Sequence, residues 1–279
     1  MGRQAGHHYI PASYLSGFTN EGKKTSRFRV QPKNGSPSYV TNPIGICKSR
    51  DYYTVEGVGD GLVVEKFYAN EIEPEIKKAL HYIQTSQQLP SMENRDGLFM
   101  LLATLYIRHP KARRWLSSGF DDIVSFVNES ITDGVKITNL DAFSFGKNDV
   151  IVSELRLLQS LLPHFSKKYY RLYISKSNNH FITSDCPVYL SHPDMATLPY
   201  FGIDTGDIEL CVPINKNAAL VGKNEPMDEG VFDADERFVA LLNTKIANSS
   251  DKIFISSNRE VKFVDQTFSV YKHSLVAEP

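Results

Sequence analysis

The feature that most constrains the fold is a long run of apolar residues at helical spacing between Leu62 and Gln87. Intervals of three and four residues place these side chains on one face of a helix, and that face must be buried against other elements. Pro74 removes a backbone N–H inside the run, so we expect it to kink or divide the helix. The residues that define the apolar face are Val64, Phe67, Tyr68, Ile72, Ile76, Leu80 and Ile83.

Further helices are predicted around this run. A short helix is expected over residues 11–18, where a proline precedes apolar residues at helical spacing. Ser91 is a suitable cap for a helix whose buried face carries Leu98, Leu101 and Leu105, and which Pro110 disturbs. Two more helices are expected near residues 120–130 and 150–162. The middle of the chain is therefore predicted to be helical.

Strand-like sequence stands on both sides of this helical middle. Residues 26–40 are typical of a hairpin with a turn at Lys33-Asn34-Gly35, and residues 51–55 are expected to extend its sheet. The strongest hairpin pattern joins residues 170–175 to residues 180–183 through a polar turn. Further strands are predicted over 209–214, 218–222, 252–256 and 260–264, with a helix over 232–248.

This order of elements predicts an α+β fold, in which a helical middle packs on a mostly antiparallel sheet formed by N-terminal and C-terminal strands. A hydrophobic content of 41% is ample for a substantial core. Neither a repeat nor a long linker divides the sequence, so we expect one domain over residues 1–279.

Charge and cysteine content limit the cellular location and the classes of binding partner that the sequence predicts. The formal net charge of −1 gives no overall field toward nucleic acid or an anionic membrane, so any polyanion binding must be local. Cys47, Cys186 and Cys211 lie far apart and form no CxxC pair, so we interpret them as buried small apolar side chains in a reducing compartment. No apolar run suits a signal peptide or a membrane helix, which predicts a cytoplasmic protein without a membrane partner. The oligomeric state is left open.

Several short motifs together resemble one known family over nearly the whole chain. They are His8-Tyr9-Ile10-Pro11, Glu65, Arg108, the segment Phe181 to Val188, and Val212-Pro213-Ile214 followed by Asn243. These motifs resemble the bacterial domain of unknown function 4238 family. Cys186 stands where that family usually has asparagine, and Val212-Pro213-Ile214 replaces a Pro-Leu-Ser-Pro type of run. Because the family has no settled activity, the resemblance implies a fold and candidate positions but no reaction.

The histidine pair supplies the first candidate site residue. Adjacent residues on an extended segment point to opposite sides, so only one of His7 and His8 can face a given site. We choose His8 because it is the position that matches the family pattern, and assign it acid–base work or metal binding. The alternative is a histidine that caps or packs.

Glu65 and Arg108 both border apolar faces of predicted helices, as their spacing from Ile72 and Leu105 shows. A free carboxylate is unfavourable there, so the two side chains are expected to be neighbours. One interpretation is a structural ion pair. The other gives Glu65 a catalytic role and lets the planar fork of Arg108 bind phosphate.

The segment after the predicted hairpin supplies the remaining candidates. Asp185 ends a strand just before Cys186-Pro187, where a rigid sheet would hold its carboxylate for catalysis or for metal binding together with His8. His180 and Ser184 are predicted to bind substrate. The alternative for Asp185 is a turn that caps the strand.

The specific signatures of common nucleotide and zinc enzymes are missing: there is no Walker A loop, dinucleotide fingerprint, His-Glu-x-x-His or paired CxxC. Two basic and aromatic clusters, residues 111–115 and 167–171, are short enough to be ordinary solvated faces.

The leading hypothesis is a metal-dependent phosphodiester hydrolase, a nuclease effector of a bacterial defence or toxin system. In this hypothesis His8 and Asp185 with Glu65 either hold a divalent metal ion or share the acid–base work, Arg108 binds phosphate, and nucleic acid or a nucleotide is the partner. A second hypothesis is a non-catalytic sensor or binding module for a nucleotide, peptide or phage-derived partner. A third is that His8, Glu65, Arg108 and Asp185 form a buried polar network.

Overall fold

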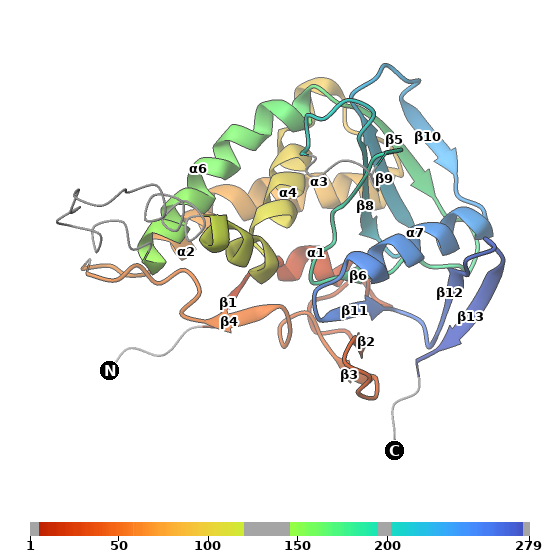
Figure 1. The fold of residues 1–279 in the computed structure, drawn as a ribbon, viewed down its shortest axis with the longest axis horizontal. Coiled ribbons are helices and arrows are strands. Elements are labelled where there is room, and N and C mark those ends of the chain that lie inside the picture. The colour runs from red at the N-terminus through yellow and green to blue at the C-terminus, as the bar shows by residue number, and fades with distance from the viewer. Residues whose placement is uncertain (1–5, 58, 120–145, 195–201, 276–279) are drawn as a thin grey trace, which may run out of the picture.

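The computed structural model describes residues 6–57, 59–119, 146–194 and 202–275. The chain is α+β with mostly antiparallel sheets, so the predicted fold class is confirmed. In Figure 1 the helices α3, α4 and α6 gather on one side of the molecule, and α7 crosses in front of the strands near β11 and β12. The helix predicted near residues 120–130 lies outside the described residues.

The N-terminal strands confirm one prediction and correct another. The hairpin is present, since β2 (Phe28–Pro32) pairs with β3 (Tyr39–Thr41) in antiparallel register. Residues 51–55 do not extend its sheet. The strand β4 (Lys48–Arg50) ends just before them and pairs with β1 (Gly6–His8) instead. Asp51 has a positive φ of 51°, which turns the chain away from any strand.

The long helix is divided as the position of Pro74 predicts. It consists of α2 (Val63–Phe67), a π-helical turn η1 (Tyr68–Ile72) and α3 (Glu73–Ser86). Pro74 lies in the first turn of α3, where its missing N–H removes no helical hydrogen bond. Widened turns of this kind occur frequently at functional sites.

The other helices of the middle follow closely. The short helix α1 (Ala12–Ser16) and the helices α4 (Asp96–Ile107) and α6 (Lys147–Ser166) all match predicted segments. Ser91 does not cap α4, because it precedes a 3-10 turn η2 (Met92–Asn94) and its Oγ accepts from Asn94 Nδ2 at 2.8 Å. Residues 110–119 are also helical.

A close backbone contact joins α3 to α4. A Cβ added at Gly97 would lie 2.4 Å from the carbonyl oxygen of Glu75, so only glycine allows this approach. It fixes α4, whose C-terminal end carries Arg108, against the helix that follows Glu65.

The larger sheet has the strand order β10-β5-β9-β8-β7, with β10 parallel to β5 and the other pairs antiparallel. Its central strands are buried on both faces, which explains their continuous apolar sequence. Leu210 and Val212 face the helical side, whereas Cys211 faces α7. The strands are β5 (Tyr169–Ile174), β7 (Tyr189–Ser191), β8 (Glu209–Asn215), β9 (Ala218–Lys223) and β10 (Gly230–Asp233).

The prediction of a hairpin over residues 170–183 is wrong. The strand β5 pairs with β9 and β10, and the chain after it runs along the β8–β9 turn, where Phe181 N–H donates to the carbonyl of Lys216. The strand β6 (Thr183–Ser184) pairs with β11 (Ile253–Ser256) in a second sheet of order β3-β2-β11-β6. This second sheet joins N-terminal strands to C-terminal ones, as the fold prediction requires.

The C-terminal elements close the fold around α7 (Glu236–Ser249). This helix begins later than predicted because residues 230–233 form β10, and the carboxylate of Asp235 caps it by accepting from Phe238 N–H at 2.7 Å. The strands β12 (Glu260–Val264) and β13 (Val270–Ser274) form a separate antiparallel pair.

Two predicted properties of the chain can be compared directly with the structure. In the described part, none of the helices has the length and apolar character needed to cross a membrane. The three cysteines are free and buried, as predicted.

Candidate functional site

A buried arginine lies where the end of α4 meets β1. Arg108 is only 1% exposed. Its Nε donates to the Tyr53 hydroxyl and its Nη2 to the carbonyl of His8, both at 2.8 Å. The guanidinium carbon lies 3.7 Å from the centroid of the Tyr68 ring, so a cation–π contact adds to these hydrogen bonds. The structure therefore holds the guanidinium in one orientation.

A second arginine, Arg113, lies beside the first. Its Nε donates to Glu154 Oε2 and its Nη1 to the carbonyl of Tyr52, both at 2.7 Å. The prediction of an ordinary solvated face for residues 111–115 is wrong at this position, because the Arg113 side chain is only 13% exposed and its guanidinium lies 3.3 Å from the Tyr52 ring centroid.

Tyr53 connects the two arginines. Its hydroxyl accepts from Arg108 and donates to Glu154 Oε1 at 2.9 Å, and burial raises the pKa of this phenol well above its ordinary value. The phenol therefore stays neutral and fixes both partners. We call the whole set the arginine cluster; it comprises His7, Tyr52, Tyr53, Glu65, Tyr68, Arg108, Arg113 and Glu154.

Four buried polar atoms of the arginine cluster have no hydrogen-bond partner within the described residues: Arg108 Nη1, Arg113 Nη2, Glu65 Oε2 and His7 Nε2. We call them the open atoms. They make up half of the eight side-chain atoms of this kind in the described part of the chain. A buried group without a partner costs about 1–3 kcal/mol, and more when it is charged. This concentration makes the arginine cluster the candidate site.

Of the predicted site residues, Glu65 and Arg108 belong to the arginine cluster, and His8 reaches it through its backbone carbonyl. Burial raises the pKa of the Glu65 carboxyl, and the nearby charge of Arg108 opposes that shift. Burial lowers the pKa of His8, whose half-buried ring contacts the carbonyl of Pro43 at 3.2 Å. Glu73, just after the π turn, acts electrostatically on both Glu65 and His8. The expected neighbourhood of Glu65 and Arg108 is thus present, but Glu65 Oε2 takes no part in an ion pair with the described residues.

His7 lies deeper than His8. The two rings leave opposite sides of β1, as the extended backbone requires, and it is His7 that stacks on Tyr53 at 6.2 Å between centroids. Its Nδ1 accepts from Tyr53 N–H at 2.9 Å. The ring inside the cluster is therefore that of His7 and not that of His8, which was the predicted one, although the carbonyl of His8 contacts Arg108.

Glu154 was missed, although its spacing contained a signal. It stands three residues after Ile151 and four before Leu158, on the buried face of α6, and is itself fully buried. A glutamate at such a position needs a cationic partner. No comparable spacing marks Arg113 in the sequence.

The remaining predicted residues are engaged elsewhere. Both carboxylate oxygens of Asp185, a residue only 3% exposed, accept backbone N–H groups, from Asp251 at 2.9 Å and from Lys252 at 2.7 Å. The Oγ of Ser184 accepts from Cys186 N–H at 3.1 Å. The contacts of Asp185 hold the turn before β11, a distant segment, and not a local turn that caps the strand of Asp185.

We therefore expect Asp185→Asn to lower the free energy of unfolding by about 1–3 kcal/mol, because an amide can accept only one of the two N–H groups without presenting its own NH2 to the other. Urea denaturation measures this change. Asp233→Asn is the control, since its carboxylate is 72% exposed and its pair with Lys176 contributes little. If the Asp185→Asn protein were stable but inactive, this result would support the catalytic role of Asp185 instead.

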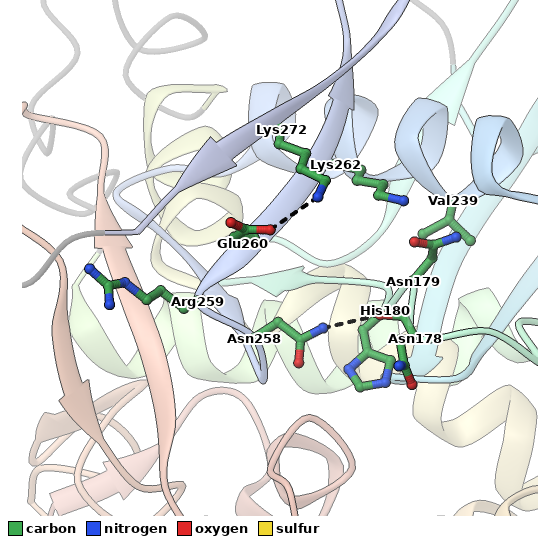
Figure 2. A pocket seen from close by; sticks show the side chains of 9 residues that line it. All are labelled: Asn178, Asn179, His180, Val239, Asn258, Arg259, Glu260, Lys262 and Lys272. Atoms are coloured by element: carbon green, nitrogen blue, oxygen red, sulfur yellow. Dashed lines mark hydrogen bonds and ion pairs between the residues drawn. The ribbon is translucent and has the colours of Figure 1, made fainter.

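His180 lines a pocket of about 370 Å³ on another part of the surface (Figure 2). Its Nδ1 lies 2.8 Å from Ser257 Oγ. Figure 2 shows Lys272 pointing toward Glu260, at 3.3 Å, and Arg259 pointing away from the other labelled side chains. Among the described residues, no contact joins His180 to the arginine cluster, so its substrate-binding role stays a prediction.

The predicted metal ligands are His8 and Asp185. Among the residues that the structure describes, no group of three or more His, Cys, Asp or Glu side chains is arranged to hold a metal ion. The divalent metal ion stays a prediction.

Comparison with known proteins gives one finding. The family model described as "Protein of unknown function (DUF4238)" matches residues 6–260. Neither the curated proteins nor the solved structures contain a match to this sequence.

Proposed function

The chain belongs to the family described as protein of unknown function (DUF4238), and we propose that it is a phosphodiester hydrolase whose arginine cluster holds the phosphoryl group. The observation that carries this proposal is Arg108 itself. Its guanidinium is fixed by Tyr53, Tyr68 and the carbonyl of His8, while its Nη1 is one of the open atoms. A preorganised guanidinium donor is suited to a phosphate oxygen and to the charge that develops on it during reaction.

The charges of the cluster support an anionic ligand. The guanidinium of Arg113 pairs with the fully buried carboxylate of Glu154. Among the described residues, no carboxylate forms an ion pair with the buried guanidinium of Arg108, whose hydrogen bonds go to Tyr53 and to the carbonyl of His8. An uncompensated buried charge is strongly unfavourable, so an anion from outside would stabilise the cluster.

The same residues can perform the hydrolysis. Water attacks phosphorus and gives a proton to the solvent, because the ring of His8, the predicted base, contacts Pro43 on the side of β1 opposite to His7. The bond from phosphorus to the leaving oxygen breaks, and protonated Glu65 gives its proton to that oxygen. DNA or RNA is the predicted substrate, in keeping with a nuclease effector of a bacterial defence or toxin system.

Glu65→Gln tests the general acid. We expect kcat for cleavage of an oligonucleotide to fall by about 10²–10⁴, because glutamine has no proton to give. Cleavage of bis(4-nitrophenyl) phosphate should fall much less, since nitrophenolate leaves without protonation. In the wild-type protein oligonucleotide cleavage should be present below the raised pKa of Glu65 and decline as pH rises through it, and Glu65→Gln should remove this dependence.

The matched control is Glu71→Gln, because Glu71 is an exposed glutamate on the same divided helix. It should change neither activity nor Tm. Equal losses on both substrates in Glu65→Gln would contradict the acid role. Binding of a phosphodiester by the wild-type protein without any turnover would replace the hydrolase by the sensor hypothesis.

A further inference from the structure

We infer that His7 is a third hydrogen-bond donor to the ligand of the arginine cluster, and that the cluster selects a phosphodiester, with one negative charge, over a phosphomonoester dianion. This inference rests on the proposed function, and it gives a role to a residue that sequence reasoning set aside. It follows from the tautomer of His7, the position of its ring and the charges around it.

The tautomer of His7 is fixed by the backbone. Its Nδ1 accepts from Tyr53 N–H at 2.9 Å, so this nitrogen carries no proton. In a neutral imidazole the proton must then be on Nε2, which makes Nε2 a donor. Nε2 is one of the open atoms, and the residue is only 1% exposed, so neither solvent nor a described side chain receives this N–H.

The surroundings of His7 keep it neutral. Burial holds its pKa below the ordinary value, and the charges of Arg108 and Arg113 act in the same direction, against the opposing charge of Asp51. The ring stacks on Tyr53, whose own ring lies 4.7 Å from both guanidinium carbons. His7 therefore adds a hydrogen bond beside the two arginines without adding charge.

These features define the ligand. Three of the open atoms, Arg108 Nη1, Arg113 Nη2 and His7 Nε2, are donors, so the group they receive must present acceptor oxygens. Among the described residues, the buried guanidinium of Arg108 has no carboxylate partner in an ion pair. A phosphodiester carries one negative charge and neutralises it, whereas a monoester dianion would leave a buried negative charge. A diester group is thus the class of ligand that matches both donors and charge.

Two substitutions at His7 separate its two nitrogens. Asparagine can place an acceptor near Nδ1 and keep the contact with Tyr53 N–H, but it lacks the distal donor. Glutamine can place an amide N–H near Nε2 but loses the Nδ1 acceptor. Calorimetric titration with dimethyl phosphate, a diester that resists turnover, and with methyl phosphate at pH 8 measures binding directly, and His81→Asn on α3 controls for a general effect of replacing histidine.

We expect the wild-type protein to bind dimethyl phosphate more tightly than methyl phosphate. His7→Asn should weaken dimethyl phosphate binding by about 10- to 100-fold, because one hydrogen bond to a charged group is lost. Its Tm should be nearly unchanged. His7→Gln should bind better than His7→Asn despite a lower Tm.

The inference is overturned by unchanged affinity in His7→Asn, by a loss of affinity that follows Tm in both variants, or by tighter binding of methyl phosphate. Wild-type binding with this pattern but without turnover of any diester would defeat the hydrolase proposal and leave the role of His7 intact.

Discussion

Replacing Glu154 with alanine is expected to lower the free energy of unfolding by about 3–5 kcal/mol, the usual result of removing one partner from a buried ion pair. Glu154 is fully buried, and its two carboxylate oxygens receive Arg113 Nε and the Tyr53 hydroxyl. Without it, two guanidinium charges remain in the core and the phenol loses its acceptor. Urea denaturation followed by circular dichroism measures the change.

Two further variants show whether the charge of Glu154 is responsible. Glu154→Gln keeps an acceptor for Tyr53 but removes the charge, so its stability should lie between those of the wild-type protein and Glu154→Ala. Lys78→Ala removes an exposed ion pair with Glu75 and should cost about 0–1 kcal/mol. A Glu154→Ala protein as stable as Lys78→Ala would mean that the cluster does not depend on its internal charge balance.

The fold was predictable where neighbouring strands pair with each other. The hairpin of β2 and β3 and the pair of β8 and β9 are close in sequence, and their apolar patterns and turns were sufficient. The predicted hairpin of residues 170–183 failed because both of its halves pair with strands further along the chain, β5 with β9 and β6 with β11. Local alternation of apolar and polar residues indicates a strand but does not show which other strand pairs with it.

The candidate site residues were also predictable where local spacing was sufficient, and not where a tertiary contact decides. Helical spacing placed Glu65 and Arg108 beside buried faces, and the structure shows that the charge of Arg108 acts on Glu65. Arg113 could not be found in this way, because it stands among exposed charged residues and is covered by tertiary contacts with Tyr52, Tyr53 and Glu154. Strand geometry established that one histidine faces the cluster. Which of the two histidines faces the cluster depends on the side of β1 that Tyr53 covers, and this is a tertiary contact.

Arg108→Met is expected to reduce kcat for phosphodiester cleavage by about 10²–10³, the effect of removing one preorganised donor to a developing charge. Methionine fills a similar volume and removes the buried charge, so the fold should be retained, although the Tyr53 hydroxyl and the carbonyl of His8 each lose a donor. Arg108→Lys should also be impaired, because one ammonium group cannot reach both of these partners and a phosphate oxygen together. Oligonucleotide cleavage under single-turnover conditions measures the chemical step.

Arg95→Met is the matched control, because Arg95 is also a buried arginine but each of its three guanidinium nitrogens donates a hydrogen bond. Its Nε donates to the carbonyl of Pro90, and its Nη1 and Nη2 donate to the two carboxylate oxygens of Glu229. Arg95→Met should therefore lose stability and keep its activity, whereas Arg108→Met should lose far more activity than its loss of stability explains. If both variants lost stability and activity in the same proportion, Arg108 would be a structural residue like Arg95, and its open Nη1 would not mark a ligand.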